Sequence, residues 1–313
     1  MTKLPNEEFR AMVPLLREED FYEHEPIRKI HWPEYNEAQI KEVTETLDFI
    51  REQVDCCKYL EVKGKVGRPL TDPKILAKAI LIAEAFGFRE RESQGWIKIL
   101  GSCVGIHQEL DERVIGDAYD HPEVLFILKQ VFEKSKTSDG KLAGDGTGLE
   151  TTRKQNYESD KKTGEYMTSI VDSREVVQAF DVSGKQECRA MHELIEKVTG
   201  TSLRLDAGFV DRKLIKKISA LGMKPFVFPK KSINLNGSPA WKNMYLELYY
   251  DVMTWLTEYY QRTHAESFHS SFKRKNGILL KRRSFCILSQ VTARIIIHNR
   301  SRLAYFNRIS TAA

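Results

Sequence analysis

The chain has 313 residues, of which 41% are hydrophobic and 30% are charged, a size that suits two globular domains or one domain with a sizeable appendage. No stretch approaches the ~20 apolar residues of a membrane span, and the first ten residues lack the apolar run of a secretory signal. The five scattered cysteines show no paired metal-ligand spacing, so we expect reduced thiols and a cytoplasmic protein.

The formal net charge is +5, but the charges are unevenly distributed. From Glu266 to the last residue, ten side chains are basic and Glu266 alone is acidic. Such a block of cations indicates a polyanionic partner, of which nucleic acid is the commonest. Acidic side chains elsewhere in the fold would be an equally good explanation, because they could balance this charge internally.

The N-terminal part of the chain is predicted to be helical. Residues 1–66 form an acidic segment with one helix, at 36–56, where apolar residues recur at helical spacing. Glycines and a proline at 64–69 then signal a turn. Residues 67–137 are predicted to form a domain of short helices, at 73–86, 90–100, 111–119 and 122–132. Their brief connections resemble a helix-turn-helix DNA-binding domain, although an ordinary helical bundle gives the same pattern.

Residues 138–313 are predicted to form a separate α/β domain. The expected strands are 141–148, 165–172, 175–183, 202–206 and 224–228. The expected helices are 188–198, 210–221, a long one at 245–275 and a last one at 289–305, with a loop at 229–243. This order is that of the ribonuclease-H-like fold, a mixed five-stranded sheet flanked by helices. An all-helical N-terminal domain would precede it.

Two strand ends carry an aspartate among small residues. Asp145 lies within Gly-Asp-Gly-Thr-Gly, and Asp206 is followed by Ala-Gly-Phe. The first and fourth strands are adjacent in this fold, so both carboxylates can reach one pair of metal ions. Mg²⁺ prefers carboxylate oxygens and water, and phosphoryl transfer commonly uses two such ions. Either aspartate alone would also suit an ordinary turn or helix cap.

A third carboxylate lies on the predicted helix at 245–275. At ~100° per residue, Tyr259, Arg262, Glu266 and Lys273 fall within an arc of roughly 60°. This face would present a metal-binding carboxylate between two cations that suit DNA phosphates. An ordinary ion pair between Arg262 and Glu266, four residues apart, is the plainer interpretation.

These motifs together resemble the insertion-sequence DDE transposases. Tyr259, Arg262, Glu266 and Lys273 reproduce the spacing of that family's Tyr-Arg-Glu-Lys signature. The segments at Asp145 and Asp206 resemble its two aspartate boxes. The resemblance covers residues 142–308, and Gly-Arg-Pro at 67–69 with the following helices resembles the family's N-terminal region.

The resemblance implies a function and its site residues. Asp145, Asp206 and Glu266 would coordinate two Mg²⁺ ions, for which Mn²⁺ can substitute. The enzyme would cleave DNA at transposon ends and transfer the 3′-OH strand into target DNA. The expected partners are double-stranded DNA, as terminal inverted repeats and target, and a second copy of the chain on that DNA. The expected location is the nucleoid.

Further residues are weaker candidates for DNA contact. Beside Tyr259, Arg262 and Lys273, we expect Arg274 and Lys275 to contact the DNA backbone. Trp241, in the predicted loop, could stack on a flipped base or simply fill a surface groove. Asp172, Asp181, Glu187 and Asp211 are rival carboxylates, and local turn or cap roles suffice for Asp172 and Asp211. His264 and His269 flank Glu266 and are expected to be solvated or packed.

Two other functions remain compatible with these residues. A ribonuclease-H-like nuclease without strand transfer would share all three carboxylates. A non-catalytic DNA-binding protein derived from a transposase would need none of them, so their presence argues against it.

Overall fold

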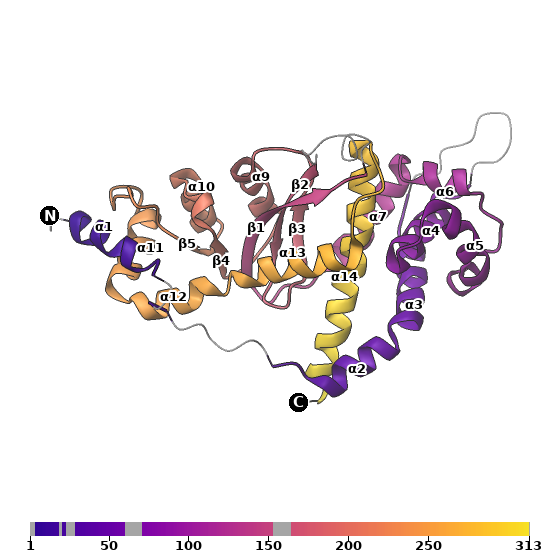
Figure 1. Ribbon diagram of the computed structural model, residues 1–313, viewed down its shortest axis with the longest axis horizontal. Helices are drawn as coiled ribbons and strands as arrows, with labels where there is room; N and C mark the ends of the chain where they lie inside the picture. Colours follow the sequence, from indigo (N-terminus) through magenta and orange to yellow (C-terminus); the bar gives the residue numbers. More distant parts are fainter. Residues whose placement is uncertain (1–3, 19–20, 23–28, 60–70, 153–163, 313) are drawn as a thin grey trace. The chain divides into compact units, whose positions relative to one another are not determined.

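A computed structural model describes residues 4–18, 21–22, 29–59, 71–152 and 164–312 (Figure 1). Its internal contacts divide the chain into two compact units, each discontinuous in sequence. The unit that we call the sheet unit contains Met1–Lys29, Thr137–Gly148 and Tyr166–Ser271, and the helical unit contains Ile30–Lys136, Leu149–Glu165 and Phe272–Ala313. The predicted domain ranges were sequential instead, and the boundary predicted at residues 66 and 67 lies outside the described residues.

The five predicted strands are all present. They are β1 (Lys141–Glu150), β2 (Gly164–Val171), β3 (Val177–Asp181), β4 (Ser202–Leu205) and β5 (Lys224–Val227). The sheet has the order β3-β2-β1-β4-β5, in which β2 and β3 are antiparallel while β4 is parallel to both β1 and β5. This mixed sheet, with helices between the later strands, confirms the predicted ribonuclease-H-like arrangement.

Helices pack around this sheet and complete the core of the sheet unit. α9 (Glu187–Leu194) contacts β3, α10 (Arg212–Ala220) contacts β5 and α11 (Pro239–Tyr250), and α12 (Val252–Tyr260) also contacts β5. A helix that the sequence did not predict, α1 (Asn6–Leu15), buries Phe9 and Val13 in the same core, where Phe9 meets Tyr245. The N-terminal segment therefore contributes to the core beside the sheet.

The prediction of a single long helix at 245–275 is wrong. The structure has three helices there: α11, α12 and α13 (Thr263–Asn276). Asp251 leaves the helical conformation at φ −138°, and its carboxylate accepts a hydrogen bond from the Thr254 backbone N–H, which caps α12. Capping aspartates offer the backbone such an alternative to a continuous helix. A turn at Gln261 and Arg262 makes the second break.

The helical unit contains the predicted helices, one of which is divided into two. It consists of α2 (Trp32–Ile40), α3 (Glu42–Asp55), α4 (Pro73–Phe86), α5 (Glu90–Leu100), α6 (Glu112–Ala118), α7 (Pro122–Lys134) and α14 (Ser284–Ala312). The one helix predicted at 36–56 is thus two, separated at Lys41. α4 is capped by Asp72 and ends at the left-handed Gly87, and it contacts α3, α7 and α14. Residues 76–84 of α4 are all buried, which makes α4 the core of this unit.

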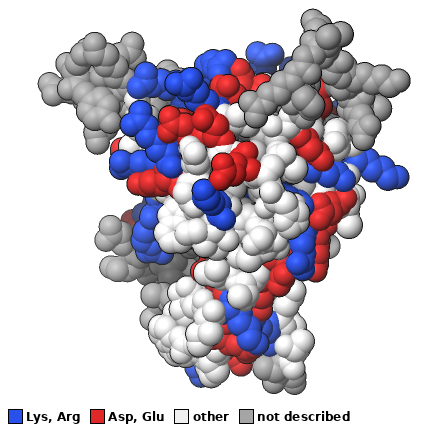
Figure 2. All heavy atoms as spheres, turned by 90° about the vertical axis from the view of Figure 1, so that its right-hand side faces the viewer, with Lys and Arg blue, Asp and Glu red and all other residues white. Residues whose placement is uncertain are grey.

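Acidic side chains of the helical unit balance much of the basic C-terminal segment. Arg294 pairs with Glu84 at 2.6 Å, and both side chains are buried. Further ion pairs join Lys275 to Glu42, Lys281 to Glu90, Arg283 to Asp120, and both Arg300 and Arg308 to Glu45. On the face in Figure 2, Lys and Arg side chains lie among Asp and Glu and form no continuous basic field. Internal neutralisation therefore accounts for part of this charge.

None of the described helices is both long enough and apolar enough to cross a membrane.

Candidate active site

The register of the sheet brings Asp145, in the middle of β1, close to Asp206, which directly follows β4. β1 pairs in parallel with β4 as far as Gly144 and Leu205, and each aspartate is the residue that follows this last pair. A side chain at Gly144 would overlap Leu205 and Met191, with 2.7 Å from its Cβ to each. The missing side chain thus lets β1, β4 and α9 approach one another just before the carboxylates.

A buried histidine joins Asp145 to α13. His269 Nδ1 lies 3.5 Å from Asp145 Oδ2, and its Nε2 lies 2.8 Å from Ser169 Oγ on β2. Because a carboxylate only accepts hydrogen bonds, we assign the ring proton to Nδ1, so Nε2 accepts from the serine hydroxyl. The side chain of His269 is 6% exposed. It therefore fixes the orientation of α13 relative to β1 and β2.

Tyr259 supports the second aspartate. Its hydroxyl donates to Asp206 Oδ1 at 3.5 Å, and its ring stacks on Trp255 with centroids 5.3 Å apart. Burial raises the pKa of the Tyr259 phenol, so the phenol keeps the proton that it donates. Buried Arg204 of β4 holds α12 in place, since it donates to the Glu258 carbonyl at 2.6 Å and pairs with the Glu258 carboxylate.

The third carboxylate, Glu266, lies in the first turn of α13. Arg262 Nη1 donates to Glu266 Oε1 at 2.6 Å, and the guanidinium lies 5.5 Å from the centre of the Tyr259 ring. The Nε of Arg262 is buried and has no acceptor among the described residues. One donor of this guanidinium is therefore unsatisfied within the protein interior.

The carboxylates of this region suit a hard divalent cation by their chemistry, although no three of their ligand atoms lie within 4.8 Å of one another in the part of the chain that the structure describes. Asp145, Asp206 and Glu266 offer carboxylate oxygens, which suit Mg²⁺ or Mn²⁺ and not soft metals. The side chains of Asp145 and Glu266 are 25% and 48% exposed, so water and ions can reach them.

Residues 136–302, more than half of the chain, match a family model described as Transposase DDE domain. The chain belongs to this family. Among solved structures, it is similar to the piggyBac transposase synaptic complex with hairpin DNA, determined by cryo-EM, at 12% identity and a TM-score of 0.43. That match covers 91% of this chain and 77% of the other. No curated protein sequence matches the chain.

The four signature residues of this DDE domain do not lie on one helix, contrary to the sequence prediction. Tyr259 is the second-to-last residue of α12, Arg262 lies in the turn, and Glu266 and Lys273 lie on α13, so they do not share one helix face. Tyr259 is 3% exposed, and its hydroxyl contacts Asp206. Lys273 and Arg274 are exposed on α13.

The predicted base-stacking role of Trp241 is not supported. Trp241 belongs to α11 and not to a loop, and it is 2% exposed within the core of the sheet unit. Its indole N–H donates to the Asn234 carbonyl at 2.8 Å, and its ring packs edge-on against Tyr245. The polar stretch predicted as a loop at 229–243 suggested a surface position, but Trp241 is part of the packed interior.

Sequence reasoning undervalued three residues around the carboxylates: Tyr166, Glu187 and His269. The position of His269, three residues after Glu266, was the available signal, because such residues share a helix face. Glu187 begins the helix that follows β3, and its Oε1 accepts from the Tyr166 hydroxyl at 3.0 Å. No local pattern distinguishes either residue from an ordinary surface glutamate or tyrosine.

Another group of potential metal ligands has a structural explanation. The ligand atoms of Cys188, His192 and Asp211 lie within 4.8 Å of one another. Asp211 already caps α10 through the Lys213 N–H, at 2.8 Å, and is 2.9 Å from His192 Nε2. These bonds tie α9 to α10.

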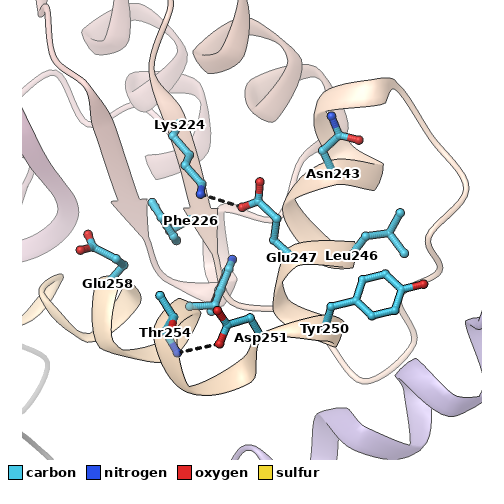
Figure 3. Close-up of a pocket in the computed structure, with 10 residues that line it drawn as sticks. Lys224, Phe226, Asn243, Leu246, Glu247, Tyr250, Asp251, Thr254 and Glu258 are labelled. Carbon is cyan, nitrogen blue, oxygen red and sulfur yellow. Dashed lines mark hydrogen bonds and ion pairs between the residues drawn. The ribbon is translucent and has the colours of Figure 1, made fainter.

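A surface hollow of about 400 Å³ lies elsewhere in the sheet unit (Figure 3). It is lined by β5, α11 and α12, and Lys224 and Glu247 form an ion pair of 2.8 Å across part of it. Its lining includes none of the three DDE carboxylates. Glu247 is a useful reference for them because its side chain is 48% exposed and ion-paired, as is that of Glu266.

Proposed function

We propose that the protein is a DNA transposase that cleaves DNA at transposon ends and joins the resulting 3′-OH to target DNA. The observation that carries this proposal is the convergence of the second aspartate and the signature residues: Tyr259 donates to Asp206, while Arg262 contacts both Tyr259 and Glu266. Family membership supports the same reaction class.

Asp145, Asp206 and Glu266 would hold two Mg²⁺ ions, or Mn²⁺ in their place. Bound there, such ions would activate the attacking oxygen and stabilise the leaving one. Tyr259 would keep one carboxylate oxygen of Asp206 in a fixed direction. His269 would do the same for Asp145 from the other side.

Cationic residues would bind the DNA backbone. The partly exposed guanidinium of Arg262, beside Glu266, would contact a phosphate oxygen close to the carboxylates. Lys273 and Arg274 would contact phosphates further along, while Lys275 contributes less because it is paired with Glu42 at 2.7 Å. The helical unit, with its short helices α5 and α6, would supply a second DNA contact in the manner of a helix-turn-helix domain.

The test uses labelled DNA that carries the ends of the element, with Mg²⁺ or with a chelator. Wild type should cleave it and form joined products only with Mg²⁺, while Glu266→Gln should do neither. Glu247→Gln, the matched exposed control, should behave as wild type.

Each of the other possible results would assign the protein a different function. Cleavage without joined products would make it a nuclease, and binding without Mg²⁺-dependent cleavage would make it a non-catalytic DNA-binding protein. Equal cleavage by wild type and Glu266→Gln would contradict the assigned site.

A further inference from the structure

Glu187 lies against the strand that carries Asp145. It is the first residue of α9, and its carboxylate fills the space above Gly146. A Cβ added at Gly146 would overlap Glu187 Oε1 and would lie 2.6 Å from the Tyr166 hydroxyl oxygen. The glycine after Asp145 is therefore what allows a carboxylate from α9 to approach β1.

Tyr166 holds this carboxylate in place. The hydroxyl of Tyr166, on β2, donates to Glu187 Oε1 at 3.0 Å. Burial, together with the bond to Glu187, raises the pKa of the Tyr166 phenol, so it remains a donor. Only one oxygen of Glu187 is engaged in this bond, which leaves the other free to accept a further donor or a cation.

The charges around Glu187 are mostly negative. Burial and the nearby charges of Asp145 and Asp206 raise the pKa of Glu187. The hydrogen bond from Tyr166 and the ring of His269 oppose this rise. Glu187 forms no ion pair with the described residues, whereas Glu193, on the same helix, pairs with Lys185. The carboxylates of Asp145, Glu187 and Asp206 therefore repel one another. A bound cation would remove this repulsion.

We propose that Glu187 is a fourth carboxylate of the metal-binding cluster, held by Tyr166 and admitted by Gly146. This inference rests on the proposed function, because it concerns the same metal ions. Glu187 would act as a positioning residue that binds a divalent cation directly or through one of its water ligands. The alternative is a purely structural role, in which Glu187 stabilises the positive N-terminal end of α9.

The experiment measures binding of Mn²⁺ to the full chain without DNA, by calorimetry, together with thermal unfolding with and without Mn²⁺. Glu187→Gln keeps the side-chain size and the acceptor for Tyr166 but removes the charge. We expect its Kd for Mn²⁺ to rise about tenfold. Its melting temperature without metal should rise, because a repulsive charge has been removed.

Two further variants control this result. Glu193 is a half-exposed glutamate on the same helix, so Glu193→Gln should leave the Kd for Mn²⁺ unchanged. Tyr166→Phe keeps every carboxylate and should raise the Kd by a smaller factor without lowering the melting temperature. If Glu187→Gln unfolds, Tyr166→Phe decides the question, and an unchanged Kd in that variant overturns the inference.

Asp206→Asn separates this inference from the proposed function. If Asp206→Asn weakens Mn²⁺ binding and Glu187→Gln does not, Glu187 has no role in the cluster, while the proposed site stands. If neither substitution changes Mn²⁺ binding, the proposed metal site itself is wrong. A lower melting temperature of Glu187→Gln with an unchanged Kd would assign Glu187 a structural role.

Discussion

The two units treat their carboxylates in opposite ways. In the helical unit, Glu84 accepts hydrogen bonds from Tyr119, Gln290 and Arg294, at 2.6, 2.9 and 2.6 Å, and its charge is neutralised by the arginine. In the sheet unit, Asp145, Glu187, Asp206 and Glu266 are at least partly exposed and share one neighbourhood; Arg262 pairs with Glu266, while Asp145 faces the ring of His269. A carboxylate with its cation built in stabilises a fold, whereas an unbalanced cluster is suited to cations from outside.

The largest expected effect is on activity in the sheet unit. Asp206→Asn removes one ligand charge, and a loss of several kcal/mol in transition-state stabilisation corresponds to a cleavage rate lower by about a thousandfold or more. The urea midpoint without metal should be unchanged or higher, because repulsion decreases. Cleavage kinetics and urea unfolding of the same preparation measure both. If Asp206→Asn lowered stability and activity together, this carboxylate would stabilise the fold as Glu84 does, and the contrast between the units would be lost.

Glu84→Leu tests the other side of the comparison. It leaves the guanidinium of Arg294 buried without its carboxylate, so we expect the free energy of unfolding to fall by about 3–5 kcal/mol. The double variant with Arg294→Met should recover much of this loss, as measured by urea unfolding. If the double variant is no more stable than Glu84→Leu alone, the ion pair is not the cause.

Metal should stabilise the protein through the sheet unit. At a concentration about 100 times its Kd, Mg²⁺ should add about 2.7 kcal/mol to the free energy of unfolding, because it binds the folded state preferentially. A chelator should abolish this gain in differential scanning fluorimetry. Asp145→Asn should lose the gain, whereas Glu84→Leu should keep it. Equal Mg²⁺ stabilisation of both variants would show that the ions bind somewhere else.

The smallest expected effect concerns single DNA contacts on α13. Lys273 is exposed, while Lys275 is already paired with Glu42. Lys273→Ala should therefore reduce the slope of log affinity against log salt by about one, whereas Lys275→Ala should change it less. Fluorescence anisotropy over a range of salt concentrations measures both. A larger change for Lys275 would mean that its ion pair opens on DNA.

Sequence patterns predicted the strands well because each strand is recognisable from its own local residues and the turn residues beside it. The aspartates at 145 and 206 stand out because each follows residues with a strand pattern and precedes small residues. The breaks between α11, α12 and α13 were missed because the apolar spacing continues through Asp251, whose side chain caps α12. Helix α1 was missed for a different reason, as its place in the core depends on contacts with distant residues such as Tyr245.

Single polar residues around the site were the hardest to assess. Glu187 and His269 come together with Asp145 only when β1, α9 and α13 are assembled. Trp241 shows the converse, because an aromatic side chain in a polar stretch suggested exposure and is in fact buried. Local sequence carries no information about either outcome.

The most direct test of the proposed transposase is a strand-transfer assay with a pre-cleaved DNA end, which supplies the 3′-OH, and a supercoiled plasmid as target. Wild type should join the end to the plasmid with Mg²⁺ but not with a chelator, and Glu266→Gln should form no product. Binding or hydrolysis of the DNA by wild type, with no joined product at any Mg²⁺ or Mn²⁺ concentration, would contradict the assignment as a transposase.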